Sequence, residues 1–275
     1  MFVLLIPFGF SISSLYQNSW SQAQQSMLEK HQLISQALIE PFTLFISSRQ
    51  KSLAALGKDI ITAKSQQRPY FVNKQKQKER YEHDITRLIN KYYNSYEDLV
   101  SISYISADKE TKLISSTTLN KSETDFPLYS DLPLTSLNTG KKSYRGNFIS
   151  PVFISRFNNK PVVLLKRHLI REDNETLDTI RAEVSLNYID TMCSKINFGH
   201  KGHCATVDQT GHVISHPNKE WMREIRDLSK LLVVKKMMAG LSGTTEFYSP
   251  FIKEDMVAGY SAIPGLGWGG NDSST

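Results

Sequence analysis

The stretch "GHCATVDQTGHVISHPNKEW", Gly202–Trp221, decides the fold, because its pattern is a strand, a tight turn and a second strand. Asp208 and Gly211 supply the turn, and His216 and Pro217 end the second strand. The stretch is also rich in histidine. A metal or catalytic centre therefore has to be considered before the rest of the chain.

The spacing of these residues does not favour such a centre. Residues two apart share a strand face, so His203 and His216 can approach across the hairpin while Cys204 points away from His203. Zinc needs three or four nitrogen or sulfur ligands, and no HxxxH or HExxH pair lies on a predicted helix. A catalytic Cys/His pair needs the two groups within hydrogen-bond reach. We expect no metal ligands and no catalytic residues, and no G-x-S-x-G elbow or phosphate loop indicates an enzyme elsewhere in the chain.

The composition is that of a globular protein. The 275 residues suffice for one large domain or two modest ones, and 40% hydrophobic with 22% charged residues excludes wholesale disorder. The formal charge is +6, but Lys and Arg are scattered along the chain. Their densest run, "KQKQKERYEH" (Lys74–His83), is typical of the solvated face of a helix. We therefore expect no nucleic-acid partner.

Residues 1–17 are apolar and indicate a membrane anchor. They begin "MFVLLIPFGFSISSLY", and no charged residue occurs before Glu29. A complete transmembrane helix needs about 20 apolar residues, and a signal peptide needs a basic start and a small-residue cleavage site. We expect the outer part of a transmembrane anchor whose cytoplasmic start is missing from this chain, so that the rest is extracytoplasmic. The alternative is a short apolar helix docked on the domain.

Two cysteines, Cys193 and Cys204, would then stand in an oxidising compartment. They could bridge the end of a helix to the first strand after it. The sequence leaves a disulfide and two buried thiols equally open, since it does not give the distance between the two Cα atoms.

Residues 18–66 have a helical period and predict a stalk helix. Apolar residues recur at three- and four-residue steps in one stripe, made of Met27, Ile34, Leu38, Leu53, Leu56 and Ile60. Pro41 should kink this helix rather than end it, because the stripe resumes directly after it. A second helix is predicted over Glu79–Tyr93, and its inward-facing residues are Tyr81, Ile85, Leu88 and Ile89.

Residues 67–190, the first module, change to the period of strands. Alternating runs predict strands in Asp98–Asp108 and "KLISST", and then in "NFISPVFIS", "KPVVLLKRHL" and "IRAEVSL". The looser stretch between the two groups is predicted to hold a short helix at Leu134–Asn138. This order favours an α+β fold with helices on one face of an antiparallel sheet.

Residues 191–270, the second module, repeat that order in shorter form. A connecting helix over Asn187–Phe198 leads into the opening hairpin. A helix over Arg223–Gly240 follows, and then strands in "TTEFYSPF", "DMVAGYSAIP" and "GWGG". Residues 271–275 form a polar tail that is typical of a truncated end. The chain is thus predicted to be two related sheet modules in tandem behind a helical stalk.

Two motifs carry a resemblance to a known family. "FGHKGHCATVDQTGHVISHPN" with "GLSGTTEFYSPFIKEDMVAGYSAIPGLGWG" resembles the membrane-proximal half of a double Cache (dCache) sensor domain, and "RAEVSLNYIDTM" resembles the end of its membrane-distal half. The resemblance implies two tandem PAS-like modules with antiparallel sheets on a long N-terminal helix. It also implies a sensor facing the periplasm from the bacterial inner membrane, coupled to a histidine kinase, diguanylate cyclase or chemotaxis output.

One dCache subfamily binds amino acids through a distal motif in which Arg, Trp and Tyr lie close together and a final Asp holds the ligand amine. The corresponding stretch here, "DFPLYSDLPLTSLNTGKKSYRG", has no Trp and no Arg before Arg145. Glu183 stands at the position of the final Asp. The chain therefore departs from the amino-acid motif, although Glu183 could still hold a cationic group.

The ligand pocket implied for such a module lies between the sheet and the loop that covers it. The candidate ligand-binding residues are Tyr129, Asp131 and Tyr144 on the loop and Ser150, Lys166, His168 and Glu183 on the strands. Lys166 and His168 share one strand face, while Arg167 takes the other. Basic groups favour a carboxylate and Glu183 a cation, so we expect a small organic acid, amine or amino-acid-like ligand and no cofactor.

The stripe on the stalk lets two copies pack side by side, which predicts a homodimer through the stalk helix. Contact with the membrane is expected through the N-terminal segment. Two alternatives from other classes stay open at this point. One is a periplasmic adhesion or spacer module without a small-molecule ligand, and the other is a histidine-based metal-binding protein.

Overall fold

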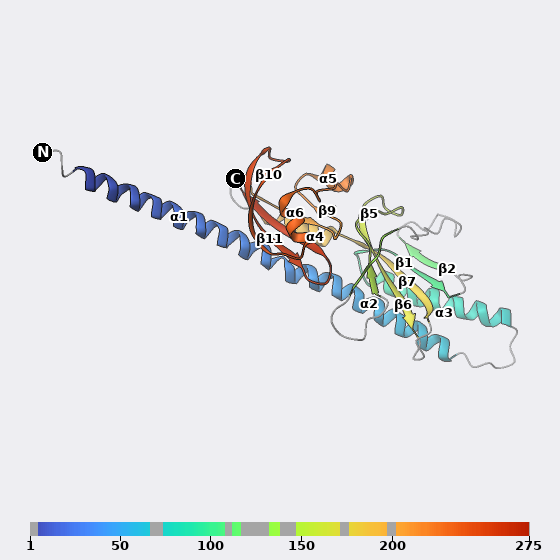
Figure 1. The fold of residues 1–275 in the computed structure, drawn as a ribbon. Coiled ribbons are helices and arrows are strands. Elements are labelled where there is room, and N and C mark those ends of the chain that lie inside the picture. Colours follow the sequence, from blue (N-terminus) through green and yellow to red (C-terminus); the bar gives the residue numbers. More distant parts are fainter. Residues whose placement is uncertain are drawn as a thin grey trace.

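The computed structural model describes residues 5–66, 74–107, 112–116, 132–137, 147–170, 176–196 and 202–274. Two long helices run nearly end to end, and two antiparallel sheets lie side by side along them (Figure 1). The N-terminal end of the first helix extends well beyond the sheets, and the C-terminus lies beside the second sheet (Figure 1). The predicted α+β class and the long N-terminal helix are confirmed.

The stalk consists of α1 (Leu5–Ala37) and α2 (Ile39–Gln66). The break falls at Leu38, because Pro41 has no N–H to bond to the carbonyl of Ala37 four residues earlier. Helical structure resumes immediately after the break. Pro41 therefore interrupts the stalk without ending it, as the sequence predicts.

The first sheet has seven strands in the order β2-β1-β7-β6-β4-β3, with β5 paired to β6. All of its pairings are antiparallel. Its strands are β1 (Leu99–Ser106), β2 (Lys112–Ser116), β3 (Thr135–Ser136), β4 (Asn147–Ile149), β5 (Phe153–Ile154), β6 (Pro161–Ile170) and β7 (Thr176–Ser185). This sheet lies against α2 and α3 (Lys74–Asn94), which leaves its other face turned away from the helices (Figure 1).

The short helix predicted at Leu134–Asn138 is wrong. Thr135 and Ser136 form β3 instead and pair with β4, and the N–H of Leu137 donates to the carbonyl of Asn147 at 3.0 Å. These bonds to a neighbouring strand hold the segment extended. Periodicity cannot distinguish a strand from a helix in so short an apolar run.

The second sheet has five strands in the order β10-β11-β12-β8-β9. They are β8 (His203–Val207), β9 (Val213–Ser215), β10 (Gly243–Ser249), β11 (Glu254–Ile263) and β12 (Trp268–Ser274). The connecting helix is α4 (Asn187–Ser194), shorter than the Asn187–Phe198 predicted. The C-terminal part of that prediction, residues 197–198, lies outside the described residues.

The single helix predicted over Arg223–Gly240 is wrong in its first half. The structure has two short helices there, α5 (Lys219–Arg223) and α6 (Leu232–Met238). Between them Ile225 has a φ of 51°, a left-handed conformation that interrupts a right-handed helix. Gly240, with a φ of 77°, follows α6 and stops it, as predicted.

One hydrophobic core joins the stalk, α3 and both sheets. Phe42, Leu56 and Ile60 of α2 are fully buried, and so are Ile85 and Ile89 of α3, which confirms the inward faces predicted for both helices. Burying a large apolar side chain contributes about 1.5–3 kcal/mol. The second half of the stalk is therefore an integral part of the fold.

The first half of the stalk packs directly on the second sheet. A Cβ added to Gly259 of β11 would stand 2.1 Å from the carbonyl carbon of His31, so only glycine admits α1 at this distance. The buried His31 ring bonds through Nδ1 to Asp272 Oδ2 and through Nε2 to Ser274 Oγ, each at 2.8 Å. α1 is thus tied to β12. The polar tail predicted at residues 271–275 is wrong over residues 271–274, because these residues pair with β11 and β8 as part of that strand.

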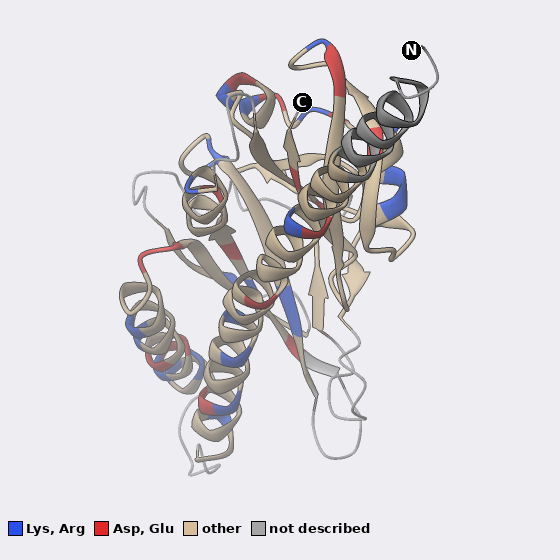
Figure 2. Cartoon of the chain, turned by 90° about the vertical axis from the view of Figure 1, so that its left-hand side faces the viewer, with Lys and Arg blue, Asp and Glu red and all other residues tan. Residues whose placement is uncertain are grey.

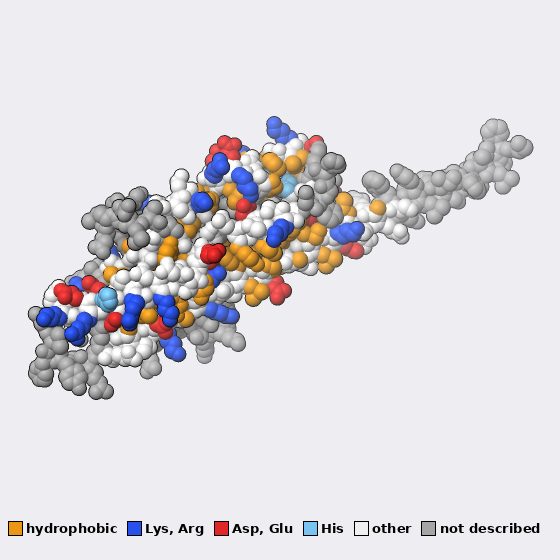
Figure 3. Space-filling model, turned by 180° about the vertical axis from the view of Figure 1, so that it is seen from behind, with side chains coloured by type: hydrophobic (Ala, Val, Ile, Leu, Met, Phe, Trp, Pro, Cys, Tyr) orange, Lys and Arg blue, Asp and Glu red, His pale blue; other side chains and the backbone are white. Residues whose placement is uncertain are grey.

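The surface carries charge and apolar groups in different patterns. Basic and acidic residues are interspersed over the helices and strands (Figure 2). Apolar side chains gather along the body in line with the projecting helix (Figure 3), and Leu33 and Leu44 on the stalk are 64% and 58% exposed. Within the described residues, no helix is both long and apolar enough to cross a membrane.

Candidate ligand sites

The turn of the opening hairpin is built around one buried carboxylate. Asp208 Oδ1 accepts hydrogen bonds from the N–H groups of Thr210 at 2.8 Å and His212 at 3.1 Å. Gly211 completes the turn with a φ of 87°, a value that favours glycine. The predicted roles of Asp208 and Gly211 are confirmed.

A disulfide joins the connecting helix to this hairpin. Cys193 of α4 and Cys204 of β8 are bonded, with their Cα atoms 5.3 Å apart. Of the two possibilities that the sequence leaves open, the structure therefore has the disulfide. It fixes the end of the connection between the two sheets against the first strand of the second sheet.

The other face of the hairpin gathers aromatic rings. The ring centroids of His203 and His216 lie 5.4 Å apart, and His216 stacks on Trp221 at 4.5 Å. Phe251 lies edge-on to both histidines. Burial and the neighbouring His203, Lys219 and Arg226 lower the pKa of His216 to about 3. His216 is therefore neutral at physiological pH.

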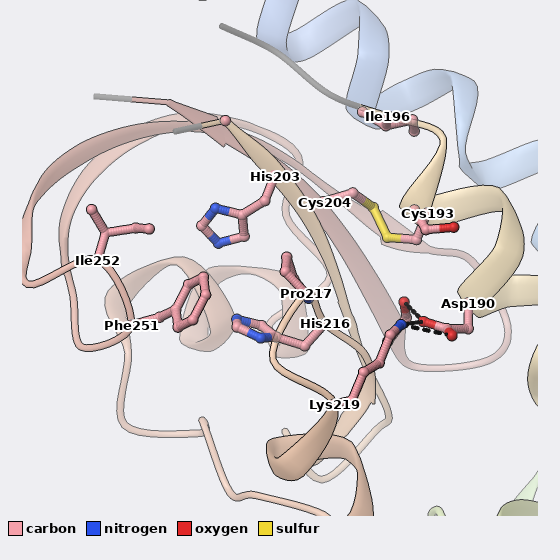
Figure 4. A pocket seen from close by; sticks show the side chains of 13 residues that line it. Asp190, Cys193, Ile196, His203, Cys204, His216, Pro217, Lys219, Phe251 and Ile252 are labelled. Atoms are coloured by element: carbon pink, nitrogen blue, oxygen red, sulfur yellow. Dashed lines mark hydrogen bonds and ion pairs between the residues drawn. A yellow bond between two sulfur atoms is a disulfide. The ribbon is translucent and has the colours of Figure 1, made fainter. Parts of the chain in front are cut away.

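Three of these rings, those of His203, His216 and Phe251, line a pocket of about 480 Å³ between α4, the hairpin and the turn after β10 (Figure 4). Lys219 and Asp190 form an ion pair on one side of it, with Nζ–O distances of 2.7 and 2.8 Å. No group of three or more His, Cys, Asp and Glu residues in the described part of the chain could hold a metal ion. His203 and His216 pack against each other and against neighbouring rings, and both border the cavity.

A second cluster of polar groups lies on the face of the first sheet that is turned away from the helices. Lys166 of β6 pairs with Arg181 of β7, and Glu183 of β7 pairs with Leu164, two residues before Lys166. His168 continues the same face, since residues two apart point the same way. We call Lys166, His168, Arg181 and Glu183 the polar face.

Glu183 is the most deeply buried member of the polar face, with no exposed surface. The Ser155 hydroxyl donates to its Oε2, while its Oε1 accepts no hydrogen bond from any described residue. Burial raises the pKa of this carboxyl to about 8, and the hydroxyl of Ser101 offsets only part of the rise. Glu183 is thus held mainly in its neutral form at pH 7.

Lys166 and His168 both lie near Phe148 of β4. The Lys166 ammonium is 5.6 Å from the Phe148 ring centroid, and the His168 ring meets that ring edge-on at 5.6 Å. His168 Nδ1 is 3.0 Å from the Thr179 hydroxyl. Burial and then Arg181 lower the pKa of Lys166, and burial, Lys166 and Arg181 lower the pKa of His168. The polar face is a concentration of positive charge around one buried acid.

The structure does not bring all seven candidates together. Ser150 is fully buried, with its hydroxyl donating to the Pro151 carbonyl and accepting from Leu164 N–H, so it serves the backbone. The three loop candidates, Tyr129, Asp131 and Tyr144, lie outside the described residues.

Sequence reasoning missed Arg181 and Phe148. Arg181 could have been found, because it precedes Glu183 by two residues in a strand and must share its face. Phe148 joins the cluster through the register of β4 against β6, which places it opposite Lys166. That register has no local signal in the sequence.

The architecture defines a class, the tandem two-sheet domain built on a long stalk helix. A family model described as Cache domain (dCache_1) matches residues 17–269. The chain belongs to this double Cache family. Its members are extracytoplasmic sensor modules of membrane receptors, which bind ligands and carry out no catalysis.

Solved structures show the same fold. The ligand-binding domain of the Campylobacter jejuni chemoreceptor Tlp3 in complex with L-norvaline aligns with a TM-score of 0.63 at 14% identity, covering 91% of each chain. The extracellular domain of rpHK1S-Z16, described as a histidine kinase, gives 0.62 at 15% identity, covering 92% of this chain and 95% of that one. The Pseudomonas fluorescens chemoreceptor CtaA with L-isoleucine gives 0.59 at 11%, covering 92% and 94%. A search of curated proteins finds no match to this chain.

Proposed function

We propose that this chain is the ligand-sensing domain of a transmembrane signalling receptor and that its first, membrane-distal module binds a small polar or charged metabolite. The observation that carries the proposal is the polar face. A sheet whose opposite face is filled by α2 and α3 has no structural need for three basic groups and a buried carboxyl on this one. Charged groups gathered away from the main core are typical of a recognition site.

The groups on the polar face favour a ligand that carries a carboxylate. Lys166 and Arg181 lie opposite one another on β6 and β7. The charge of Arg181 lowers the pKa of Lys166, and both charges lower the pKa of His168. An anion between them would relieve that repulsion. Glu183 offers an oxygen to an ammonium or hydroxyl group on the same ligand. A zwitterionic ligand would place its carboxylate between Lys166 and Arg181 and its ammonium against Glu183.

The solved relatives support this choice of ligand class. Tlp3 is described in complex with L-norvaline and CtaA with L-isoleucine, and both ligands are zwitterionic. This chain departs from the amino-acid motif of that subfamily, so a different small zwitterion or an organic acid fits equally. Tyr129, Asp131 and Tyr144 stay candidates for the covering side of the site.

The stalk is proposed to carry the signal. Residues 1–17 would anchor the chain in the inner membrane, residues 67–190 and 191–270 would form the two modules outside it, and two stalks would pair in a homodimer. Leu33 and Leu44 expose apolar surface that such a pairing would cover. A ligand shifts the stalk only if it binds two states with different affinity.

Thermal-shift and calorimetric screening against organic acids, amines and amino acids tests the proposal. A hit should lose affinity by about tenfold or more in Glu183→Gln and in Lys166→Gln, because each variant removes one charged contact. The matched controls are Glu97→Gln and Lys58→Gln, which change exposed residues away from the polar face. No hit across a broad library would favour the spacer alternative, and affinity unchanged in both variants would place the ligand elsewhere.

A further inference from the structure

The aromatic pocket of the second sheet is distinct from the polar face and has no part in the function proposed above. It lies where α4 meets the hairpin, and its walls come from segments far apart in the chain. Figure 4 shows His203, His216 and Phe251 turned toward one another on one side, with the Lys219–Asp190 pair on the other. A volume of about 480 Å³ is that of a cavity for a small molecule.

We propose that this pocket is a second ligand site, which binds a small monocarboxylate with an apolar or aromatic body. Its carboxylate would accept hydrogen bonds from His216 and Lys219, and its body would lie against Phe251 and Ile252. The ligand would then touch α4, which lies in the chain segment between the last strand of the first sheet and the first strand of the second.

His216 presents an unused donor to the pocket. Its Nδ1 accepts a hydrogen bond from the N–H of Asn218 at 3.0 Å. A neutral imidazole that accepts at one nitrogen carries its proton on the other, so Nε2–H is a donor. The residue is 4% exposed, and its Nε2 makes no hydrogen bond to any described residue. A donor at the wall of a pocket can be satisfied by a ligand oxygen.

The charges around the pocket select an anion over a cation. Asp190 is already engaged, because its carboxylate accepts from the Ser215 hydroxyl at 2.8 Å and from Lys219 through both oxygens. Lys219 directs two of its three N–H donors at Asp190 and the third at Met222 Sδ, 3.7 Å away, a weak acceptor that a ligand carboxylate would replace. Arg226, stacked over Trp221 at 4.2 Å, adds positive charge behind the rings. A ligand amine would be repelled by Lys219 and Arg226, and the Asp190 carboxylate, which is already paired, would not be available to bind it.

The remaining walls require an apolar body on the ligand. Phe251 lies 4.9 Å from the His216 ring centroid and 5.5 Å from that of His203, and Ile252 follows it on the same turn. These side chains offer no hydrogen-bonding groups, so hydroxyl groups on the part of the ligand that lies against them would be left unsatisfied. A branched aliphatic or benzoic acid matches this lining.

Calorimetry and saturation-transfer NMR on the 275-residue chain, with benzoate and isovalerate as probes, test the inference. Both acids should bind saturably in the millimolar range or below, and the amides benzamide and isovaleramide should bind about tenfold more weakly or worse. His216→Phe keeps the ring stack but removes Nε2–H, so it should weaken acid binding by about tenfold. Ile252→Trp fills the pocket and should abolish binding, and it serves as the second variant if His216→Phe does not fold.

The control variant is Lys58→Gln, at an exposed position away from both sites, which should leave acid binding unchanged. A further variant, Lys166→Gln, tells binding at this pocket from binding at the polar face. Three results would overturn the inference: no saturable binding of either acid, binding that survives both His216→Phe and Ile252→Trp, or binding lost in Lys166→Gln and kept in the pocket variants. The last result would assign the probes to the polar face. Failure here would leave the proposal for the first module untouched, because the two sites share no residue.

Discussion

Asp208 in the turn of the second sheet accepts a hydrogen bond from the backbone N–H of Val152 in the first module, with Oδ2 and N 2.8 Å apart. The carboxylate has no exposed surface, and its Oδ1 holds the hairpin turn at the same time. One side chain therefore fixes the local turn and the contact between the two modules.

Asp208→Asn should destabilise the chain by about 3 kcal/mol, because the amide offers one acceptor oxygen and turns its NH₂ toward a backbone donor. Urea denaturation measures the change. Asp255→Asn, at an exposed position on β11, is the matched control and should change stability by less than about 0.5 kcal/mol. Equal effects of the two substitutions would contradict the role given to Asp208.

Glu183 should make stability fall as pH rises through neutrality. Its pKa is about 8 in the folded chain against the usual 4.5, so between these values the folded chain keeps a proton that the unfolded chain has lost. The stabilising contribution is complete below pH 4.5, declines up to about pH 8 and levels off above it. The decline amounts to about 1.4 kcal/mol per pKa unit.

Glu183→Gln should remove that decline, since the amide does not titrate, and should leave the variant more stable than the parent chain near pH 8. Chemical denaturation at intervals from pH 5 to pH 9 checks this. Glu97→Gln is the control, because Glu97 is exposed. Parallel pH profiles for the parent chain and Glu183→Gln would show that Glu183 is not the group responsible.

Binding of a ligand ammonium to Glu183 should release a proton at pH 7. The cation favours the ionised carboxyl and lowers its pKa from about 8, so a group that starts mainly protonated ends ionised. Calorimetric titrations in buffers with different ionisation enthalpies measure the proton count. Binding enthalpies that do not vary with the buffer would separate Glu183 from the ligand amine.

The disulfide should stabilise the second module by about 2–3 kcal/mol, because it closes a loop between residues 11 apart and limits the unfolded chain. The double substitution Cys193→Ala with Cys204→Ala should lower the free energy of unfolding by that amount. Dithiothreitol should produce the same loss in the parent chain and none in the double variant. A loss in both would mean that the reductant acts through something other than this bond.

The sequence alone predicted those features of the fold that are determined by residues close together in the chain. The turn at Asp208 and Gly211, the proline break of the stalk and the inward faces of Ile85 and Ile89 depend only on neighbours a few residues away. Alternation in β6 likewise placed Lys166 and His168 on one face. Each of these follows from backbone sterics or from a fixed period.

The remainder depends on contacts between distant segments. Phe148 reaches Lys166 only through strand pairing, and β3 is extended because β4 lies beside it. The aromatic pocket needs Phe251 from one turn and His216 from a hairpin 35 positions earlier in the chain. Contacts between segments this far apart cannot be predicted from the periodicity of either segment.

Gly259→Ala should detach the first half of the stalk from the second sheet. The new Cβ would stand 2.1 Å from backbone atoms of His31, and a helix backbone cannot give way as a flexible side chain can. We expect a loss of about 3 kcal/mol or more. The bonds from His31 to Asp272 and Ser274 should be lost with it, because they require the same close approach.

Gly270→Ala is the matched control, since a Cβ there meets Leu38 at 3.4 Å, an ordinary contact. Denaturation gives the stability change, and amide hydrogen exchange along β11 and α1 shows whether the two elements separate. Because α1 is the element that leads out of the domain, Gly259→Ala should also abolish any ligand-dependent protection of α1 while the polar face still binds. Retained protection in this variant would mean that ligand binding reaches the stalk by a route other than the crossing of α1 and β11.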